Sequence, residues 1–277
     1  GSPDEPGQIG VGITTPTLID NTPNLPSFDY KRTNFNNDKL LSLNTILNPT
    51  PQLKIKWLGF ANPTKKSFYR NTVQNYHLED IQFTNTEDYQ FTRNIDNYFT
   101  KLELQLEPNK RTLLSYSGTL GSLRKNDLGA LLFNGVQSEE LTKSKGYLTN
   151  HSLSYSYKFS ERDVLVSSLR WIKQQSPLDY SINQYYYEDL FGGKDIHAVK
   201  QHIENNLQYL GATTHYVSRK KNGDFFELAF NMAYQQQQLN TELKLLSNPD
   251  ELGGTAVSPS EFSNAMDLNV FQTNLIS

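Results

Sequence analysis

Cysteine is absent from the 277-residue sequence, so disulfide bonds, thiol catalysis and cysteine-based metal sites are excluded. Long apolar runs are absent too. No stretch approaches the ~18 apolar residues that a membrane-spanning helix needs, and mean hydropathy is −0.62. We therefore do not expect membrane-spanning helices. Spanning by β-strands stays open, because its signal in a sequence is alternation rather than overall hydropathy.

Recognisable catalytic or metal-binding groupings are also missing. Ser115 and Ser154 lack the G-x-S-x-G setting of a hydrolase nucleophile. His197 and His202, five residues apart in a polar stretch, are the only histidines near a ligand spacing, and we expect no metal there. We predict that the protein is not an enzyme and carries no cofactor and no metal.

An excess of positive charge is a further absence. The formal net charge of −3 argues against nucleic acid as the main partner. Aromatic residues, by contrast, are plentiful, with 16 Tyr and 15 Phe, which argues against a disordered chain. Many aromatics with few aliphatics suit strands that have one apolar face and one wet face.

The clearest pattern is a two-faced hairpin over residues 98–120. Strand side chains alternate between the two faces of a sheet. Here the apolar residues take one parity and the charged or amide residues take the other: Leu102, Leu104 and Leu106 against Lys101, Glu103 and Gln105. Residues 107–111 read as a tight turn. Each arm is long for a globular protein and comparable with the 9–11 residues of a membrane-spanning strand.

The same alternation recurs along the chain. Hairpins of this type are predicted around turns at 48–52, 160–163 and 218–224, and a last strand is predicted around Met266, Leu268 and Val270. These segments make about nine or ten strands, counting a short one at 9–13. We therefore divide the chain into an N-terminal loop segment, 1–39, and antiparallel strands with their connections, 40–277.

The connections alternate in length. Four short turns alternate with four long polar connections, predicted at 62–94, 121–145, 176–201 and 239–261. Transmembrane β-barrels have this asymmetry, with short periplasmic turns and long extracellular loops. The sequence thus predicts an all-β, antiparallel, up-and-down transmembrane β-barrel, with the short turns at one end and the long loops at the other.

Two sets of residues follow from this interpretation. The residues predicted to face the lumen include Lys101, Glu103, Gln105, Glu227, Asn231 and Asp267. The residues predicted to face lipid include Leu102, Leu104, Leu106, Tyr155, Tyr157, Phe226, Leu228, Phe230 and Met232. The alternative is a soluble sheet whose apolar side packs on a second sheet. In a long loop, Tyr185, Tyr186 and Tyr187 are candidates for stacking on a flat ligand, and ordinary loop packing is their simpler role.

Several motifs in order resemble one known family. They are the segment 36–44, the segment 83–89, the strand 98–104, and the hairpin containing 152–155 and 160–165. Together they resemble the barrel of TonB-dependent outer-membrane receptors, in the branch with an extra carboxypeptidase-regulatory-like N-terminal domain. The resemblance covers roughly residues 30–275.

The resemblance implies part of a 22-stranded barrel in the cell outer membrane. It also implies a plug domain and contact with the TonB complex through a segment not found in this chain. The ligand would be scarce, such as a siderophore, cobalamin or an oligosaccharide. Two alternatives stay open: a self-contained β-barrel or β-sandwich that binds a ligand or surface, and, less favoured, a membrane-embedded hydrolase. If the chain is a slice of a larger barrel, its first and last strands will not pair with each other.

Overall fold

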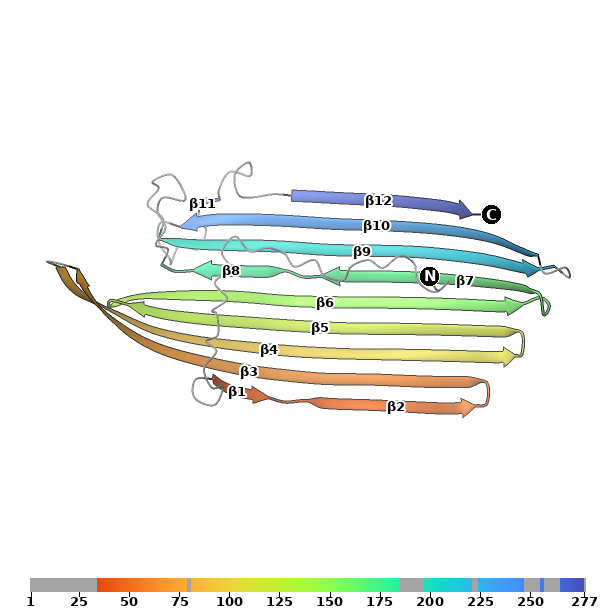
Figure 1. Cartoon of the computed structure of the whole chain (residues 1–277), viewed down its shortest axis with the longest axis horizontal. Coiled ribbons are helices and arrows are strands. Elements are labelled where there is room, and N and C mark those ends of the chain that lie inside the picture. The colour runs from red at the N-terminus through yellow and green to blue at the C-terminus, as the bar shows by residue number, and fades with distance from the viewer. Residues whose placement is uncertain are drawn as a thin grey trace.

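The computed structural model describes residues 34–78, 81–184, 197–220, 224–246, 255–256 and 265–276. These residues form one antiparallel sheet (Figure 1). Its twelve strands are β1 (Asn34–Asp38), β2 (Leu41–Thr50), β3 (Leu53–Leu78), β4 (Ile81–Asn109), β5 (Thr112–Phe133), β6 (Val136–Lys158), β7 (Asp163–Gln175), β8 (Leu178–Ile182), β9 (Ala198–Arg219), β10 (Phe225–Leu246), β11 (Thr255–Ala256) and β12 (Ala265–Ile276). The all-β, antiparallel prediction is confirmed for this part of the chain.

Twelve strands occupy nine rows of the sheet. β1 and β2 both pair with β3, β7 and β8 both lie between β6 and β9, and β11 and β12 both pair with β10. The two strands of each such pair share one row; the interruption between β7 and β8 falls at Pro177, which has no N–H to donate to a ladder. Neighbouring rows follow one another in the sequence, so the sheet is a meander.

The predicted short turns lie together at one end of the sheet, as expected. They join β2 to β3, β4 to β5, β6 to β7 and β9 to β10, at the right of Figure 1. Of residues 1–39, predicted as a loop, Asn34–Asp38 form β1. Residues 1–33, with the predicted strand at 9–13, lie outside the described part of the chain.

Two of the long connections, however, are not loops. Residues 62–78, 81–94 and 121–145 continue the hairpins, so β3 and β4 run for 26 and 29 residues. Pairing continues as far as Leu78 with Ile81 and Phe133 with Val136. The second of these hairpins turns at Asn134 and Gly135, whose φ angles of 48° and 84° are those of a two-residue hairpin turn.

The other two long connections are partly strand. Residues 178–182 of the predicted connection 176–201 form β8, and its residues 198–201 begin β9. Residues 239–246 of the predicted connection 239–261 still belong to β10. The remaining positions include residues 185–196 and 247–254, which lie outside the described part.

Strand pairing defines two faces, since directly paired residues point to the same side of a sheet. We call the side that carries Leu102 and Leu104 face A, and the side that carries Lys101 and Glu103 face B. We call the half of each long strand next to the four short turns the proximal half, and the remainder the distal half. Every lipid-facing candidate named above lies on face A.

Along the long strands, the apolar side chains change from face A to face B. On β4, Leu102, Leu104 and Leu106 lie on face A, but Phe91 and Ile95 lie on face B. On β9, Leu210 lies on face A, whereas Ile203 lies on face B. The β3–β4 and β9–β10 pairings contain no register shift. The exchange therefore results from the order of apolar and polar residues in the sequence and is not produced by a β-bulge.

Burial follows the same exchange. The buried apolar side chains of the distal half lie mostly on face B, where Ile203, Leu243 and Val199 are each about 1% exposed; Leu246, on face A, is equally enclosed. The proximal half instead leaves its face A side chains open, with Tyr98 and Phe230 about half exposed. The hydrophobic core of the described residues therefore sits on face B, away from the short turns.

The sheet is open in the described part of the chain. β2 pairs with β3 and β12 pairs with β10, and no pairing joins β1 or β2 to β12. The described residues thus form twelve strands of one sheet, not a closed 22-stranded barrel. Nor do these residues supply a second sheet, which the β-sandwich alternative would require.

One face assignment was wrong. Asp267 pairs with Gln238, and Val270 pairs with Gln235. Asp267 consequently lies on face A, and Met266, Leu268 and Val270 lie on face B. Alternation within an isolated strand shows which residues share a side, but only the pairing register shows which side that is.

Candidate membrane-spanning surface

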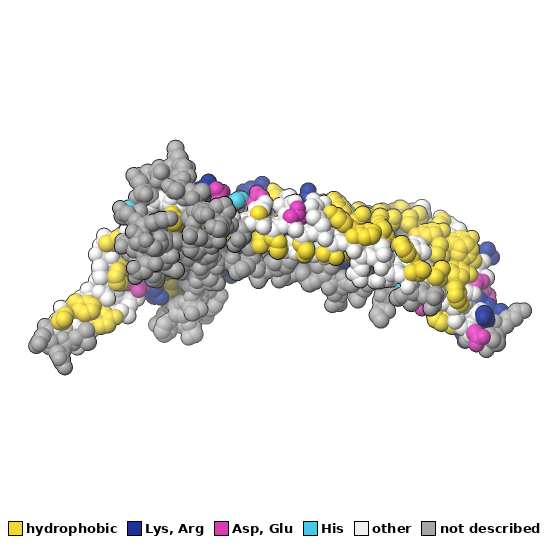
Figure 2. Space-filling view, turned by 90° about the horizontal axis from the view of Figure 1, so that it is seen from above, with side chains coloured by type: hydrophobic (Ala, Val, Ile, Leu, Met, Phe, Trp, Pro, Cys, Tyr) yellow, Lys and Arg dark blue, Asp and Glu magenta, His cyan; other side chains and the backbone are white. Residues whose placement is uncertain are grey.

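An apolar belt covers face A in the proximal half. It occupies residues 53–61 of β3, 98–106 of β4, 114–120 of β5, 147–157 of β6, 165–171 of β7, 210–216 of β9 and 226–234 of β10. Figure 2 shows hydrophobic side chains gathered over this end of the molecule. Four of these stretches, on β3, β4, β6 and β10, reach the 9–11 residues with which a tilted strand crosses a bilayer, and the other three are shorter.

Aromatic residues mark both limits of the belt. Tyr155, Tyr157, Phe159, Tyr216 and Phe226 form a contiguous series near the short turns, with ring centroids 4.9–6.5 Å apart. At the opposite limit lie other aromatic side chains: Tyr98, Tyr147, Trp171 and Tyr234. Rings that combine an apolar body with a polar atom favour the two interfaces of a bilayer.

A polar group inside the belt is satisfied within the sheet. The Tyr116 hydroxyl lies 2.7 Å from Nδ1 of His151, and the His151 ring stacks on Trp171 with centroids 5.5 Å apart. Gly118 pairs directly with His151 and leaves room for the Tyr116 ring, because an added Cβ would lie 2.9 Å from Cζ of Tyr116. The three strands thus hold an imidazole in a mostly apolar surface.

The opposite side of the same strands is polar. One cross-strand row on face B carries only hydrogen-bonding side chains: Lys54, Gln105, Ser115, Ser154, Ser168, Thr213 and Asn231. Ser168 and Thr213 are hydrogen-bonded at 2.6 Å. Side chains beside this row line a hollow of about 200 Å³.

Apart from Asp267, the residues predicted to face the lumen lie on face B. In the first group, Glu103 pairs with Lys101 at 2.6 Å and with Lys56 at 3.2 Å. The second group lies on β9 and β10, where Glu227 accepts a 3.1 Å hydrogen bond from Nδ1 of His215. Gln105 and Asn231 belong to the polar cross-strand row described above, which lies between these two groups. Whether face B borders a lumen stays a prediction, and Tyr185, Tyr186 and Tyr187 lie outside the described residues.

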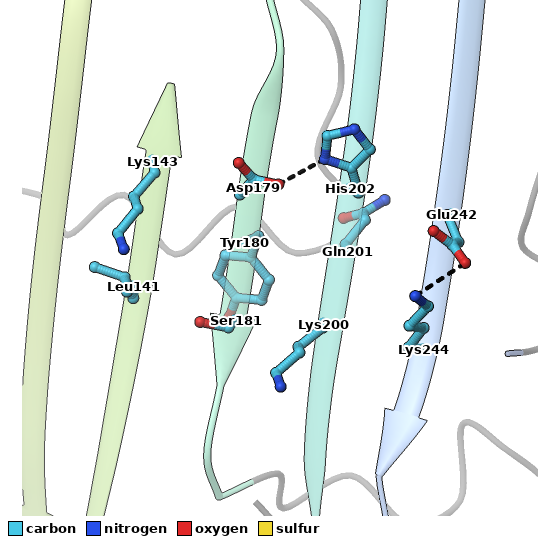
Figure 3. A pocket seen from close by; sticks show the side chains of 10 residues that line it. All are labelled: Leu141, Lys143, Asp179, Tyr180, Ser181, Lys200, Gln201, His202, Glu242 and Lys244. Carbon is cyan, nitrogen blue, oxygen red and sulfur yellow. Dashed lines mark hydrogen bonds and ion pairs between the residues drawn. The ribbon is translucent and has the colours of Figure 1, made fainter. Parts of the chain in front are cut away.

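Farther from the turns, face A carries charges. A hollow of about 420 Å³ is bordered there by side chains of β6, β8, β9 and β10 (Figure 3). Nδ1 of His202 lies 2.6 Å from Asp179, and Lys244 pairs with Glu242 at 3.2 Å. The hydrogen bond to Asp179 raises the pKa of His202, and Glu204 adds to this effect. The distal half of face A is accordingly suited to water.

Face B of the distal half combines apolar burial with ion pairs. Arg93 binds Asp127 through two hydrogen bonds of 2.9 and 2.8 Å, and Lys125 lies 3.0 Å from the same carboxylate. Burial, with the negative charge of Glu140, raises the pKa of Tyr89 to about 12. Arg70 lies 5.7 Å from the centre of the Tyr89 ring.

The described residues contain no helical membrane span and no metal-binding group. None of their segments is a helix long and apolar enough to cross a membrane. No group of three or more His, Cys, Asp or Glu residues is placed to hold a metal ion within the ranges that the structure describes.

Sequence reasoning missed three features of this surface. The Tyr116–His151–Trp171 cluster depends on register across three rows, which no local pattern reveals. The apolar residues on face B of the distal half were not predicted, because polar residues interrupt their alternation in the sequence. A groove on face A, lined by Trp57 and Tyr147, depends on five neighbouring strands. The signal that was present but overlooked is Asn134-Gly135, a strong marker of a tight hairpin.

Comparison of the chain with protein-family models, with curated proteins and with solved structures finds no match.

Proposed function

We propose that this chain forms part of the wall of a transmembrane β-barrel in the cell outer membrane. The complete barrel would be a TonB-dependent receptor that takes up a scarce ligand, such as a siderophore, cobalamin or an oligosaccharide. The observation that carries the membrane assignment is the exchange of apolar residues between the two faces. The motifs at 36–44, 83–89, 98–104 and 152–165 support the receptor class by their resemblance.

The exchange matches three environments around one wall. In the proximal half, face A is apolar and rimmed by aromatics, as lipid requires, and face B is polar, as a hydrated lumen requires. In the distal half, face A carries His202 and Lys244, whereas face B buries Ile203 and Leu243. That half would project from the membrane, with water outside and packed protein inside.

The belt also runs obliquely across the sheet. Tyr98 and Tyr147 lie in one cross-strand row, and both belong to the belt. The same row continues to Asn206 and Gln238, which are polar. A barrel strand is tilted by about 35–45° from the axis, so a row perpendicular to the strands leaves the membrane on one side. The oblique belt supports tilted strands in a flat bilayer.

The two edges of the sheet imply further protein. Backbone N–H and C=O groups on the outer sides of β2 and β12 have no partner strand among the described residues, and in lipid each unpaired group costs several kcal/mol. Additional strands must therefore close the barrel. In the receptor proposal, these are the remaining barrel strands, and the plug domain would contact face B.

Quenching of tryptophan fluorescence tests the membrane assignment. The chain has two tryptophans, Trp57 and Trp171, and both lie on face A within the belt. The protein is refolded into phosphatidylcholine vesicles whose acyl chains carry bromine at defined depths. We expect strong quenching of both residues. Emission unaffected by bromine at any depth, with the sheet intact by circular dichroism, would refute the membrane assignment and favour a ligand-binding sheet in water.

A further inference from the structure

Resting on the proposed function, the structure assigns a binding site for one anionic, phosphate-bearing membrane lipid to face A. The site combines an apolar groove with a basic pair, Arg124 and Lys145, which lies next to the groove on the side away from the short turns. The groove would take an acyl chain, and the basic pair would take the phosphate of the same molecule.

The groove lies on the N-terminal side of the belt and has a volume of about 610 Å³. Small residues form its floor: Gly59, Ala61, Thr100, Ser122 and Thr149. Larger apolar side chains form its walls: Leu41, Leu43, Trp57, Tyr98, Leu120 and Tyr147. A hollow of this composition in a lipid-facing surface matches a flexible hydrocarbon chain.

Trp57 fixes the shape of the groove. Its indole Nε1 donates a 2.7 Å hydrogen bond to Oγ1 of Thr100 on β4. Its ring lies over Gly59, where an added Cβ would come within 3.3 Å of Cζ2 of the indole. The indole is thus held flat against the sheet and leaves the floor beside it open.

The basic pair lies beside the groove on the same face, farther from the short turns. Arg124 pairs directly with Lys145 across β5 and β6, two residues beyond Ser122 and Tyr147 in the groove. Like charges directly opposite each other in a sheet are destabilising unless an anion lies between them. Both side chains are exposed, and neither forms an ion pair with any residue in the described ranges.

Two neighbouring residues refine the charge of the site. Lys145 Nζ lies 5.2 Å from the centre of the Tyr147 ring, so one residue pair joins the basic pair to the groove wall. Asp96 pairs across the strands with Arg124, and Lys143, a further exposed positive charge, pairs across the strands with Asp179. Across the sheet, by contrast, Asp179 and Glu242 pair with His202 and Lys244. Arg124 and Lys145 therefore carry exposed positive charge that no ion pair within the described ranges neutralises.

A lipid-competition experiment tests this site. The variant Trp171→Phe leaves Trp57, which lines the groove, as the only tryptophan. It is refolded into phosphatidylcholine vesicles that contain a small fixed fraction of lipid with brominated acyl chains. That lipid is phosphatidylglycerol in one arm and phosphatidylcholine in the other. We expect brominated phosphatidylglycerol to be enriched at Trp57 by about fivefold per basic residue.

Three variants assign the enrichment to the site. The double variant Arg124→Gln/Lys145→Gln is expected to abolish it, and Ser122→Leu, which fills the floor, to reduce it several-fold. Lys54→Gln/Lys56→Gln removes two charges from face B and is the matched control, expected to leave enrichment unchanged. In the converse reporter, Trp57→Phe, the remaining Trp171 lies outside the groove and should show no preference.

Each outcome decides the assignment. Equal quenching of Trp57 by the two brominated lipids, or enrichment that survives Arg124→Gln/Lys145→Gln, would overturn it while leaving the membrane assignment intact. Absence of quenching by either lipid would instead contradict the proposed function itself. Enrichment abolished by the face A substitutions and retained by the face B control would establish the lipid site.

Discussion

The Tyr116 hydroxyl and the Nδ1 atom of His151 lie 2.7 Å apart in the middle of the apolar belt. An imidazole in lipid needs a partner for its polar atoms, because an unsatisfied group there has no water to replace it. The contribution of this contact to stability therefore tests whether the belt excludes water.

Removing the Tyr116 hydroxyl should destabilise the sheet in a membrane. In Tyr116→Phe, Nδ1 of His151 loses its partner, and we expect a loss of about 1–3 kcal/mol in the free energy of unfolding. Equilibrium urea unfolding from vesicles measures it. Tyr155→Phe removes a hydroxyl at the edge of the belt and should change stability by less than about 0.5 kcal/mol. Equal effects of the two variants would mean that the belt is wet.

Adding a methyl group at Gly118 should act through the same cluster. Gly118→Ala places a Cβ against the Tyr116 ring and pushes it from His151. We expect a loss of about 1–3 kcal/mol. The double variant with Tyr116→Phe should lose less than the sum of the single variants, because both disturb one contact. Strict additivity in this unfolding cycle would contradict the coupling.

Adjacent positions on β4 compare the two faces in the proximal half. Leu104→Arg puts a charge on face A, and we expect a loss of about 2–4 kcal/mol in vesicles, as for arginine near a bilayer midplane. Gln105→Arg adds the same side chain on face B, where water would solvate it, and should be nearly neutral. Similar unfolding free energies for both variants would count against a lipid-facing belt.

Adjacent positions on β9 make the reverse comparison in the distal half. Ile203 is about 1% exposed on face B, whereas Glu204 is exposed on face A. Ile203→Lys buries an unpaired charge, and we expect it to lose more than about 3 kcal/mol or to prevent folding. Glu204→Lys should fold normally, as judged by circular dichroism and urea unfolding. A tolerated lysine at position 203 would contradict the exchange of faces.

The Asp179–His202 contact should be sensitive to pH. The hydrogen bond raises the pKa of His202 above its unfolded value, so its stabilising effect is fully present below the unfolded pKa. That effect is lost as the pH rises through the folded pKa. Titration of the histidine by NMR should show a lower pKa for His202 in Asp179→Asn. An unchanged pKa would remove the role assigned to this carboxylate.

The proximal half of the fold was predictable because its two environments differ. With lipid proposed on one side and water on the other, Leu102 and Glu103 must alternate, and the turns at 107–111 and 160–163 are rich in turn residues. The distal half of β3 and β4 has polar residues on both sides, such as Lys65 and Lys66, so alternation vanishes there although strand pairing continues. Its strands rest on the backbone ladder with their neighbours, which a local pattern does not show.

The site was predictable only in part, for a related reason. Alternation grouped Lys101, Glu103 and Gln105 correctly, since they share one strand. The groove between Trp57 and Tyr147 and the facing pair Arg124 and Lys145 arise from pairing between different strands, and register is set by the whole sheet. Asp267 was assigned to the wrong face for the same reason.

Cysteine accessibility along β4 tests the exchange of faces most directly, and the natural absence of cysteine makes each introduced thiol unique. All four test positions lie on face A: Thr92 and Asn94 in the distal half, and Leu102 and Leu104 in the belt. In permeabilised vesicles, a water-soluble maleimide should label Thr92→Cys and Asn94→Cys. Leu102→Cys and Leu104→Cys should react only with a lipid-soluble maleimide. Equal labelling of all four thiols by the water-soluble reagent would contradict a membrane-spanning belt.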